Sequence, residues 1–508
     1  MDNAAQVLPS SPPTPGQAVF LCFQSFASLT STTPRFTATY RESCRRKGCM
    51  AMESISTKGL LPHSDNFSPL DALSDEVLLE IIHWLDMTDP PSSLPALKYT
   101  CSRLFNIIKS FPHLYYAENV NSAGETNLIA FLNHALSRPD IGPQYRSVTF
   151  CSDGNPLTVN TLKPDFSERC NAFIFEICAE TGWNAELWMS RITSGNWEDI
   201  VALVMCAVPN VQALSLPQHH WNMEEEPHFL DLVFQHAAKC QAEGSHSKFS
   251  LSKLASLDMA HWDTENGINL GSVKDFLLLP SMKRADFWAF SEDLVDEGAN
   301  FHVRQLTLAN SGVTGQAFVN LMKRCPFLER LDYEHGGPLV SDGDFLPHYM
   351  GRGLLPLKDT LRSLIMSGET ELDAFGDEQE LAIGSFRDFT KLQHIEMDRH
   401  ILLGARNHVE DENMADSAGE SENKLCDIVP RSLEVLITTT CGTDVLEQCL
   451  ELLERRAELA PALQRLELTL CCSKNDVEPL MRLHGECLRS ASTGEHKVEF
   501  IMPQIGQR

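Results

Sequence analysis

The feature that most constrains the fold is a six-residue apolar pattern that recurs ten times after about residue 140. It consists of an apolar residue, two variable ones, an apolar residue, one variable and an apolar residue. Because strand side chains alternate between two faces, the fourth and sixth positions predict a short strand with one buried face. The copies are YRSVTF (145–150), VQALSL (211–216), LASLDM (254–259), MKRADF (282–287), VRQLTL (303–308), LERLDY (328–333), LRSLIM (361–366), LQHIEM (392–397), LEVLIT (433–438) and LQRLEL (463–468).

Helical stretches separate several of these copies. Examples are Val313–Cys325, Asp444–Leu459 and Asp476–Ser490, and the strand–helix unit recurs every 20 to 45 residues or so. Such a unit cannot bury its apolar face alone, and units gain a continuous core only by stacking. The sequence therefore predicts an irregular α/β solenoid.

The pattern resembles a leucine-rich repeat, as found in F-box proteins of fungal type, over roughly residues 140–502. The resemblance implies a recognition domain, to which we assign residues 118–508. The asparagine of the standard repeat is missing and the repeat lengths are irregular, so the number of stacked repeats stays open. The widest gap contains the acidic stretch Glu410–Glu422, which predicts a flexible loop near 405–425, or alternatively an acidic docking loop.

The first 66 residues differ in composition from the rest of the chain. They are rich in Ser, Thr, Pro and Ala and poor in acids, which is typical of a disordered leader. Their mildly basic character leaves an organellar presequence as an alternative. A start at Met50 or Met52 would remove most of this segment, so its presence in the mature protein stays open.

Residues 67–117 predict two or three short amphipathic helices. Ser74 is a good N-cap residue, and apolar side chains then recur on one helical face until Pro90. A second helical stretch begins near Ser93, where Pro95 is tolerated because first-turn amides have no intrahelical partner. Helices this short cannot bury both apolar stripes against each other, so a partner or the next domain must cover the remainder.

This segment resembles an F-box, the motif that docks on the adaptor subunit of a cullin-RING ubiquitin ligase. Ser74, Ser93, Thr100 and Leu104 depart from the residues that the family prefers. An ordinary helical hairpin is the alternative interpretation. The residues that the resemblance implies for adaptor docking, or for the motif's own small core, are Leu73, Val77, Leu78, Ile81, Ile82, Leu85, Leu94, Leu97, Cys101 and Leu104.

The net charge of −28 argues against nucleic acid or an anionic membrane surface as a partner and favours basic proteins. No apolar run reaches the roughly 18 residues that span a bilayer, and the first residues lack the basic flank of a secretory signal. We therefore expect a protein of the cytoplasm or nucleus.

We expect no catalytic, cofactor-binding or metal-binding residues. The motifs GxSxG, GxGxxG, HExxH, the P-loop and the EF-hand loop do not occur in the sequence. Cysteines within apolar runs predict reduced core residues, and the pairs Cys44–Cys49 and Cys471–Cys472 lack a second pair at zinc-site spacing. We interpret the histidines between His219 and His236 as surface residues rather than metal ligands.

The fifth position of each copy should point away from the core, toward the exposed face of the solenoid. Five of the ten residues there are acidic, which predicts a surface for a Lys- or Arg-rich partner; a solvated strand face is the alternative. Asp258 beside Asp286 would repel without a neutralising group. The acidic members are Asp258, Asp286, Asp332, Glu396 and Glu467.

Together the resemblances to an F-box and to leucine-rich repeats imply a substrate-recognition subunit of a cullin-RING ubiquitin ligase, with a target protein that the sequence does not identify. Ubiquitin transfer requires proximity rather than chemistry from such a subunit, which agrees with the absent catalytic motifs. Two alternatives stay open. One is an F-box and leucine-rich-repeat scaffold that acts outside ubiquitin ligation, and the other is a small-molecule receptor.

Overall fold

The structure is a computed structural model. It describes residues 73–74, 77–78, 102–109, 115–118, 127–151, 164–217, 228–261, 267–292, 298–313, 315–336, 345–368, 382–404, 423–441, 443–470 and 499–501. The chain divides into two compact units, Met1–Pro112 and His113–Arg508.

The first unit contains most of the segment that resembles an F-box, up to Pro112. Val77 and Leu78 are helical, and Ser74 caps them: the Val77 amide donates to Ser74 Oγ at 3.4 Å, and the Leu78 amide to the Ser74 carbonyl at 3.0 Å. Helix α5 (Ser102–Lys109) follows. The predicted leader (1–66) and most of the predicted first helix lie outside the described residues.

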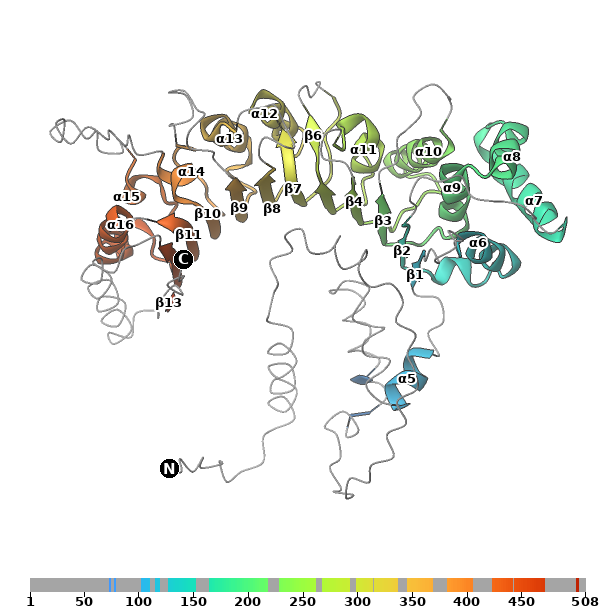
Figure 1. The fold of residues 1–508 in the computed structure, drawn as a ribbon, viewed down its shortest axis with the longest axis horizontal. Helices are drawn as coiled ribbons and strands as arrows, with labels where there is room; N and C mark the ends of the chain where they lie inside the picture. The colour runs from blue at the N-terminus through green and yellow to red at the C-terminus, as the bar shows by residue number, and fades with distance from the viewer. Residues whose placement is uncertain are drawn as a thin grey trace, which may run out of the picture. The chain divides into compact units, whose positions relative to one another are not determined.

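The second unit is built on one parallel sheet. Its strands pair in chain order from β1 to β13, with β6 pairing only with β7 at the side (Figure 1). The strands are β1 (Tyr115–Ala117), β2 (Ser147–Thr149), β3 (Ala213–Pro217), β4 (Ser256–Ala260), β5 (Arg284–Trp288), β6 (Ser291–Glu292), β7 (Gln305–Val313), β8 (Arg330–His335), β9 (Ser363–Gly368), β10 (His394–Asp398), β11 (Val435–Cys441), β12 (Arg465–Leu470) and β13 (Glu499–Ile501).

All ten copies of the six-residue pattern contain a strand of this sheet, so all ten stack. The backbone just before each strand joins its neighbours by the same hydrogen bonds. The Arg304 amide donates to the Lys283 carbonyl at 2.8 Å, and the Glu329 amide to the Arg304 carbonyl at 2.7 Å. The first, fourth and sixth residues of every copy are buried, including Thr438, the one polar member. The predicted α/β solenoid is confirmed.

Helices cover the outer side of the sheet, and the strands line the inner side of an arc (Figure 1). The helical elements of the second unit are α6 (Leu128–Ser137), η2 (Gly142–Gln144), α7 (Pro164–Thr181), α8 (Ala185–Ser194), α9 (Trp197–Ala207), α10 (Phe229–Glu243), α11 (Leu270–Leu277), α12 (Gly315–Lys323), α13 (Pro347–Leu354), η3 (Leu355–Leu357), α14 (Arg399–Leu403), α15 (Leu425–Ile428), α16 (Thr443–Glu454) and α17 (Arg456–Leu459). The predicted helices at 313–325 and 444–459 correspond to α12 and to α16 with α17, whereas 476–490 lies outside the described residues.

Local sequence sets several helix ends. The side-chain oxygens of Asn184, Asn196 and Asn269 each accept a hydrogen bond from the backbone amide three residues on, at 3.0 to 3.1 Å. They therefore satisfy amides that have no partner within α8, α9 and α11. Gly195 ends α8 in the left-handed region with φ of 85°, where a side chain would be strained.

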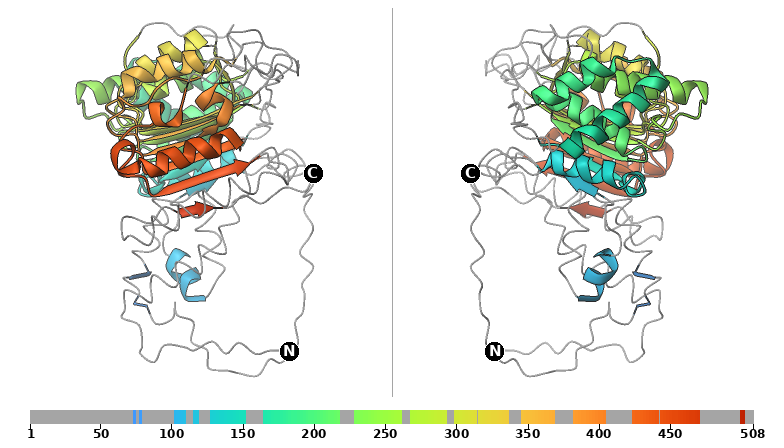
Figure 2. Two further views of the ribbon diagram at one scale, coloured as in Figure 1. Left: turned by 90° about the vertical axis from the view of Figure 1, so that its left-hand side faces the viewer. Right: turned by 90° about the vertical axis from the view of Figure 1, so that its right-hand side faces the viewer.

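The unit between β2 and β3 is the largest departure from a simple repeat. Its described residues form three helices, of which α9 is buried along most of its length and α8 packs against both α7 and α9. The right-hand view of Figure 2 looks onto this end of the second unit, with α7, α8 and α9 in green. Because α9 already covers the sheet, α7 and α8 are free to present a surface of their own.

Three strands of the structure, β1, β6 and β13, lie outside the ten predicted copies. Tyr115–Ala117, which sequence analysis assigned to the helical segment, form β1 and pair with β2. The pair β6–β7 forms beside a bulge between Leu308 and Ser311, where Asn310 has φ of 48°. Buried Ser311 then accepts a hydrogen bond from the Phe290 amide at 3.1 Å.

The cysteines agree with the prediction of reduced core residues. Cys178, Cys206, Cys325 and Cys449 are all buried, whereas Cys151 is exposed. Burial raises the pKa of the Cys325 thiol to about 12, so this side chain behaves as a small apolar residue. Within the described parts of the chain, no helix combines the length and the apolar character that crossing a bilayer requires.

Candidate functional site

The fifth-position residues form one continuous row on the exposed face of the sheet, which we call the inward row. Strand pairing places each member beside the next, for example Asp258 beside Asp286 and Asp332 beside Ile365. The sequence prediction therefore placed these residues correctly relative to one another. The inward row contains Thr149, Ser215, Asp258, Asp286, Thr307, Asp332, Ile365, Glu396, Ile437 and Glu467.

A second row on the same face, two residues earlier on each strand, was missed by sequence reasoning. We call it the upstream row. Alternation within a strand places positions two apart on one face, so this row could have been found from the sequence. It contains Ser147, Ala213, Ser256, Arg284, Gln305, Arg330, Ser363, His394, Val435 and Arg465.

The upstream row supplies a base to four of the five acids. Arg284 Nε lies 2.6 Å from Asp286 Oδ2, and Arg330 Nη2 lies 3.7 Å from Asp332 Oδ2. Further along the sheet, His394 Nε2 lies 3.6 Å from Glu396 Oε2, and Arg465 pairs with Glu467. The face is therefore a set of ion pairs with excess acid, rather than the purely acidic surface that one row suggested.

Asp258 is the acid with a serine, Ser256, at the upstream position. Its carboxylate accepts a hydrogen bond from Ser215 Oγ at 2.9 Å. Desolvation raises the pKa of Asp258, and the negative charge of Asp286 raises it further. The hydrogen bond from Ser215 and the charge of Arg284 act in the opposite direction, so they relieve part of the expected repulsion between Asp258 and Asp286.

The pKa values of Asp332 and Glu396 shift in opposite directions. Desolvation raises the pKa of Asp332, and its more distant partner Arg330 offsets this only in part. The neighbouring His394 side chain lowers the pKa of Glu396. Asp332 and Asp258 therefore hold their charge less favourably than Glu396 does, and a cation from outside would stabilise both.

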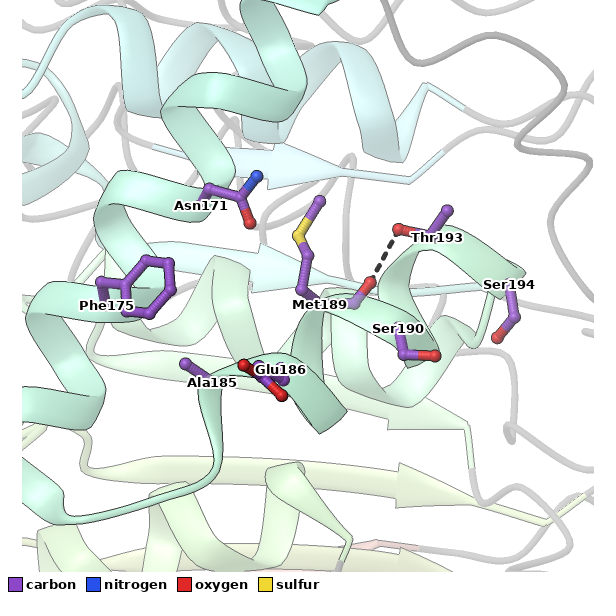
Figure 3. A pocket seen from close by; sticks show the side chains of 8 residues that line it. All are labelled: Asn171, Phe175, Ala185, Glu186, Met189, Ser190, Thr193 and Ser194. Atoms are coloured by element: carbon purple, nitrogen blue, oxygen red, sulfur yellow. Dashed lines mark hydrogen bonds between the residues drawn. The ribbon is translucent and has the colours of Figure 1, made fainter.

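A separate groove lies between α7 and α8, with a volume of about 590 Å³ (Figure 3). Phe175, 58% exposed, lies on one side together with Asn171, and Met189 projects from α8 on the other side. The groove is open. Two of the hydroxyl groups that line it donate hydrogen bonds to backbone carbonyls of α8 itself: Thr193 Oγ1 to the Met189 carbonyl at 2.7 Å, and Ser194 Oγ to the Arg191 carbonyl at 2.8 Å. This arrangement disfavours a small-molecule site, which needs converging polar groups in an enclosed cavity.

The histidines take part in local contacts. His228 Nδ1 lies 3.7 Å from Glu198 Oε2, and His236 Nε2 lies 3.3 Å from Ser247 Oγ. In the described ranges, no three side chains of the metal-binding types gather at one place. His219 and His220 lie outside the described residues.

The expected adaptor-docking residues differ in exposure. Leu78 and Leu104 are buried, with 1% and 2% of their surface exposed, whereas Val77 is 38% exposed. Leu73 is partly exposed. Ile81, Ile82, Leu85, Leu94, Leu97 and Cys101 lie outside the described residues.

Comparison with protein families agrees with this architecture. The model of the leucine-rich repeat domain matches residues 169–472, which is more than half of the chain. No curated protein matches the chain. Domains of this kind are typically non-catalytic and bind other proteins on extended surfaces of stacked repeats. The sheet, its stacked strand–helix units and the matched span together show that this chain belongs to the leucine-rich repeat domain family.

Proposed function

We propose that the protein is a non-catalytic recognition subunit of a cullin-RING ubiquitin ligase. Its leucine-rich repeats hold a target protein, and the segment 67–117 docks on the adaptor subunit. The observation that carries the first half is the unbroken inward row, because an in-register row of side chains outside the core, most of them polar, offers one extended surface to a partner. The resemblance of residues 67–117 to an F-box supports the second half.

The charge of the inner face favours a basic target. From β2 to β12 the two rows contain five carboxylates, against three guanidinium groups and one imidazole. Asp258 and Asp332, whose carboxyl pKa values are raised, gain most from a partner's cation. Complementary charge at such a surface raises the association rate and rejects acidic competitors.

Charge reversal tests target binding. The full-length protein is titrated with a fluorescent Lys-rich peptide and with a Glu-rich peptide of equal length. We expect binding of the first only, and a loss of about 100-fold or more when Asp258, Asp286 and Asp332 are all changed to Lys, because like charges then face each other. The control changes the exposed residues Glu168, Glu243 and Asp388 to Lys. Equal binding by both triple variants would refute the basic-target proposal.

Adaptor docking is tested at Val77 rather than at its buried neighbour. Val77→Asp places a charge on a partly exposed side chain, whereas Leu78→Asp buries one and threatens the fold. We expect wild-type protein to co-purify with adaptor and cullin, and Val77→Asp to lose this association while its thermal unfolding is unchanged. If wild type does not associate where another F-box protein does, the repeats serve a scaffold outside ubiquitin ligation.

A further inference from the structure

Strands β8 to β12 alternate between two kinds of inner surface, and we call this stretch the striped region. Strands β8, β10 and β12 each present an acid, Asp332, Glu396 or Glu467, beside the basic residue two positions earlier. Strands β9 and β11 present Ile365 and Ile437 at the same register position. Charged and aliphatic strands therefore follow one another across the sheet.

These side chains lie at an accessible surface. The side chains of Asp332, Glu396 and Glu467 are 33%, 39% and 27% exposed. Ile365 and Ile437 are partly exposed, while their strand neighbours Leu364 and Leu436 are fully buried. The isoleucines thus lie outside the core, as aliphatic stripes within a charged face.

The spacing of the stripes favours a helical over an extended conformation in a partner segment that lies across the strands. Neighbouring strands lie about 4.8 Å apart, so equivalent stripes repeat about every 9.6 Å. An α-helix rises about 1.5 Å per residue, and residues at i, i+3, i+7, i+10 and i+14 lie along one side at roughly 0, 4.5, 10.5, 15 and 21 Å. That series stays within about 1 Å of the first four of five successive strands, at about 0, 4.8, 9.6 and 14.4 Å, and within about 2 Å of the fifth at about 19.2 Å.

An extended peptide fits less well. Its side chains on one face repeat about every 6.6 Å, so the second already misses the neighbouring strand by about 2 Å and the third by nearly 4 Å. A helix therefore keeps in step with the stripes, and an extended chain does not.

We propose that the striped region binds an amphipathic helix of a partner protein that lies across strands β8 to β12. Its basic residues at i, i+7 and i+14 meet Asp332, Glu396 and Glu467, and its aliphatic residues at i+3 and i+10 meet Ile365 and Ile437. This inference rests on the proposed function, since it specifies the kind of basic segment that the inner face holds. Such a helix shows a heptad repeat of alternating Lys or Arg and Leu or Ile.

Three synthetic peptides test the proposal against the full-length protein. The first is a cross-linked helix of about 18 residues with Lys at i, i+7 and i+14 and Leu at i+3 and i+10. The second has the same composition and cross-link, but its Lys and Leu residues are spread around the helix. The third is an extended, proline-containing peptide of equal charge. We expect the first to bind at least about tenfold more tightly than either of the others, because only it places both anchors on their stripes.

Matched variants locate the binding site. Changing Ile365 and Ile437 to Lys should weaken the first peptide at least about tenfold, because it replaces both aliphatic stripes with repelling charge. Both side chains are partly exposed, so lysines there can reach solvent and the fold is retained. The control changes Ala117 and Thr149 to Lys, which adds the same charge to the same register row on β1 and β2. Circular dichroism and thermal unfolding check the fold of both variants.

The outcomes separate the two proposals. Preference for the first peptide, lost in the Ile365/Ile437 variant and kept in the Ala117/Thr149 variant, supports the helical partner. If the extended peptide binds as well as the first, and the Asp258, Asp286 and Asp332 reversal abolishes its binding, the basic-target function stands and the helix is refuted. If none of the three peptides binds, the basic-target proposal and the helical-partner proposal both fail.

Discussion

The inner face of the sheet changes its character between two stretches. Around β4 and β5 the acids are neighbours, with Asp258 directly beside Asp286. In the striped region an isoleucine separates each acid from the next, as Ile365 separates Asp332 from Glu396. The first stretch concentrates charge and the second spaces it.

This difference indicates that one repeat architecture can recognise a partner in two ways, by charge alone or by charge together with the spacing of apolar side chains. Two adjacent carboxylates attract a cation whatever its backbone conformation, because Coulomb attraction is not directional. Aliphatic stripes between charges require that apolar and basic side chains arrive at fixed intervals. We therefore expect β4 and β5 to select for charge, and the striped region to select for shape as well.

The distinction between the two stretches depends most on whether Ile365 and Ile437 lie outside the core. Leu364 is fully buried and Ile365 is partly exposed on the same strand. Leu364→Ala should lower the free energy of unfolding by about 2–5 kcal/mol, because it leaves a cavity. Ile365→Ala should lower it by less than about 1 kcal/mol, since part of this side chain is already in water. Urea unfolding of both variants measures the difference, and equal losses would make Ile365 a core residue.

The salt dependence of peptide binding is the next test of the two stretches, with an expected effect of intermediate size. Raising the salt concentration from about 0.1 M to about 1 M shortens the Debye length from about 10 Å to about 3 Å. Binding of the extended Lys-rich peptide should weaken by about tenfold more than binding of the heptad helix, because the leucine contacts of the helix are not screened. Fluorescence titrations at both concentrations test this, and equal salt dependence would remove the distinction between the two stretches.

The smallest effect concerns pH, and here Asp258 from the first stretch and Glu396 from the striped region should respond with opposite sign. The folded protein raises the pKa of Asp258, so its ionised form weakens folding once the pH exceeds the unfolded-state pKa. The folded protein lowers the pKa of Glu396, so its ionised form adds stability that is lost as the pH falls through the folded-state pKa.

Two neutral variants measure this difference. At pH 7 Asp258→Asn should raise the free energy of unfolding and Glu396→Gln should lower it, each by less than about 1 kcal/mol because solvent screens exposed charges. Both differences should vanish well below about pH 4, where the carboxyl groups of wild type are protonated in both states. Changes of the same sign at pH 7 would contradict the assigned environments.

Much of the fold followed from the sequence because burial follows strand alternation. Each six-residue copy encodes a strand and its inward side chain, which was enough to place Asp258 beside Asp286. Strand β1 was not predicted because its three residues form only part of the six-residue pattern, with Tyr116 as the buried member. The bulge at Asn310 depends on Phe290 and Ser311, which tertiary structure brings together.

The candidate site was predicted less completely than the fold. Reading one position per strand found the acids and overlooked Arg284, Arg330 and Arg465, although all lie two residues earlier on the same face. The alternation of Ile365 and Ile437 with acids was visible in the sequence, but its meaning depends on knowing that these strands are consecutive neighbours. The exposed Phe175 carried no sequence signal, because a helix with apolar residues on several sides does not reveal which side stays open.

The most direct test of the inner face as the binding surface is cross-link mapping. The heptad helix carries a photoreactive phenylalanine at i+3, the position expected to meet Ile365, and is irradiated with the full-length wild-type protein. Mass spectrometry should place the cross-links within Ser363–Gly368, with weaker products in the adjoining strands. Cross-links confined to the α7–α8 groove near Phe175 and Met189 would contradict the account and move the binding surface to the helical side of the repeats.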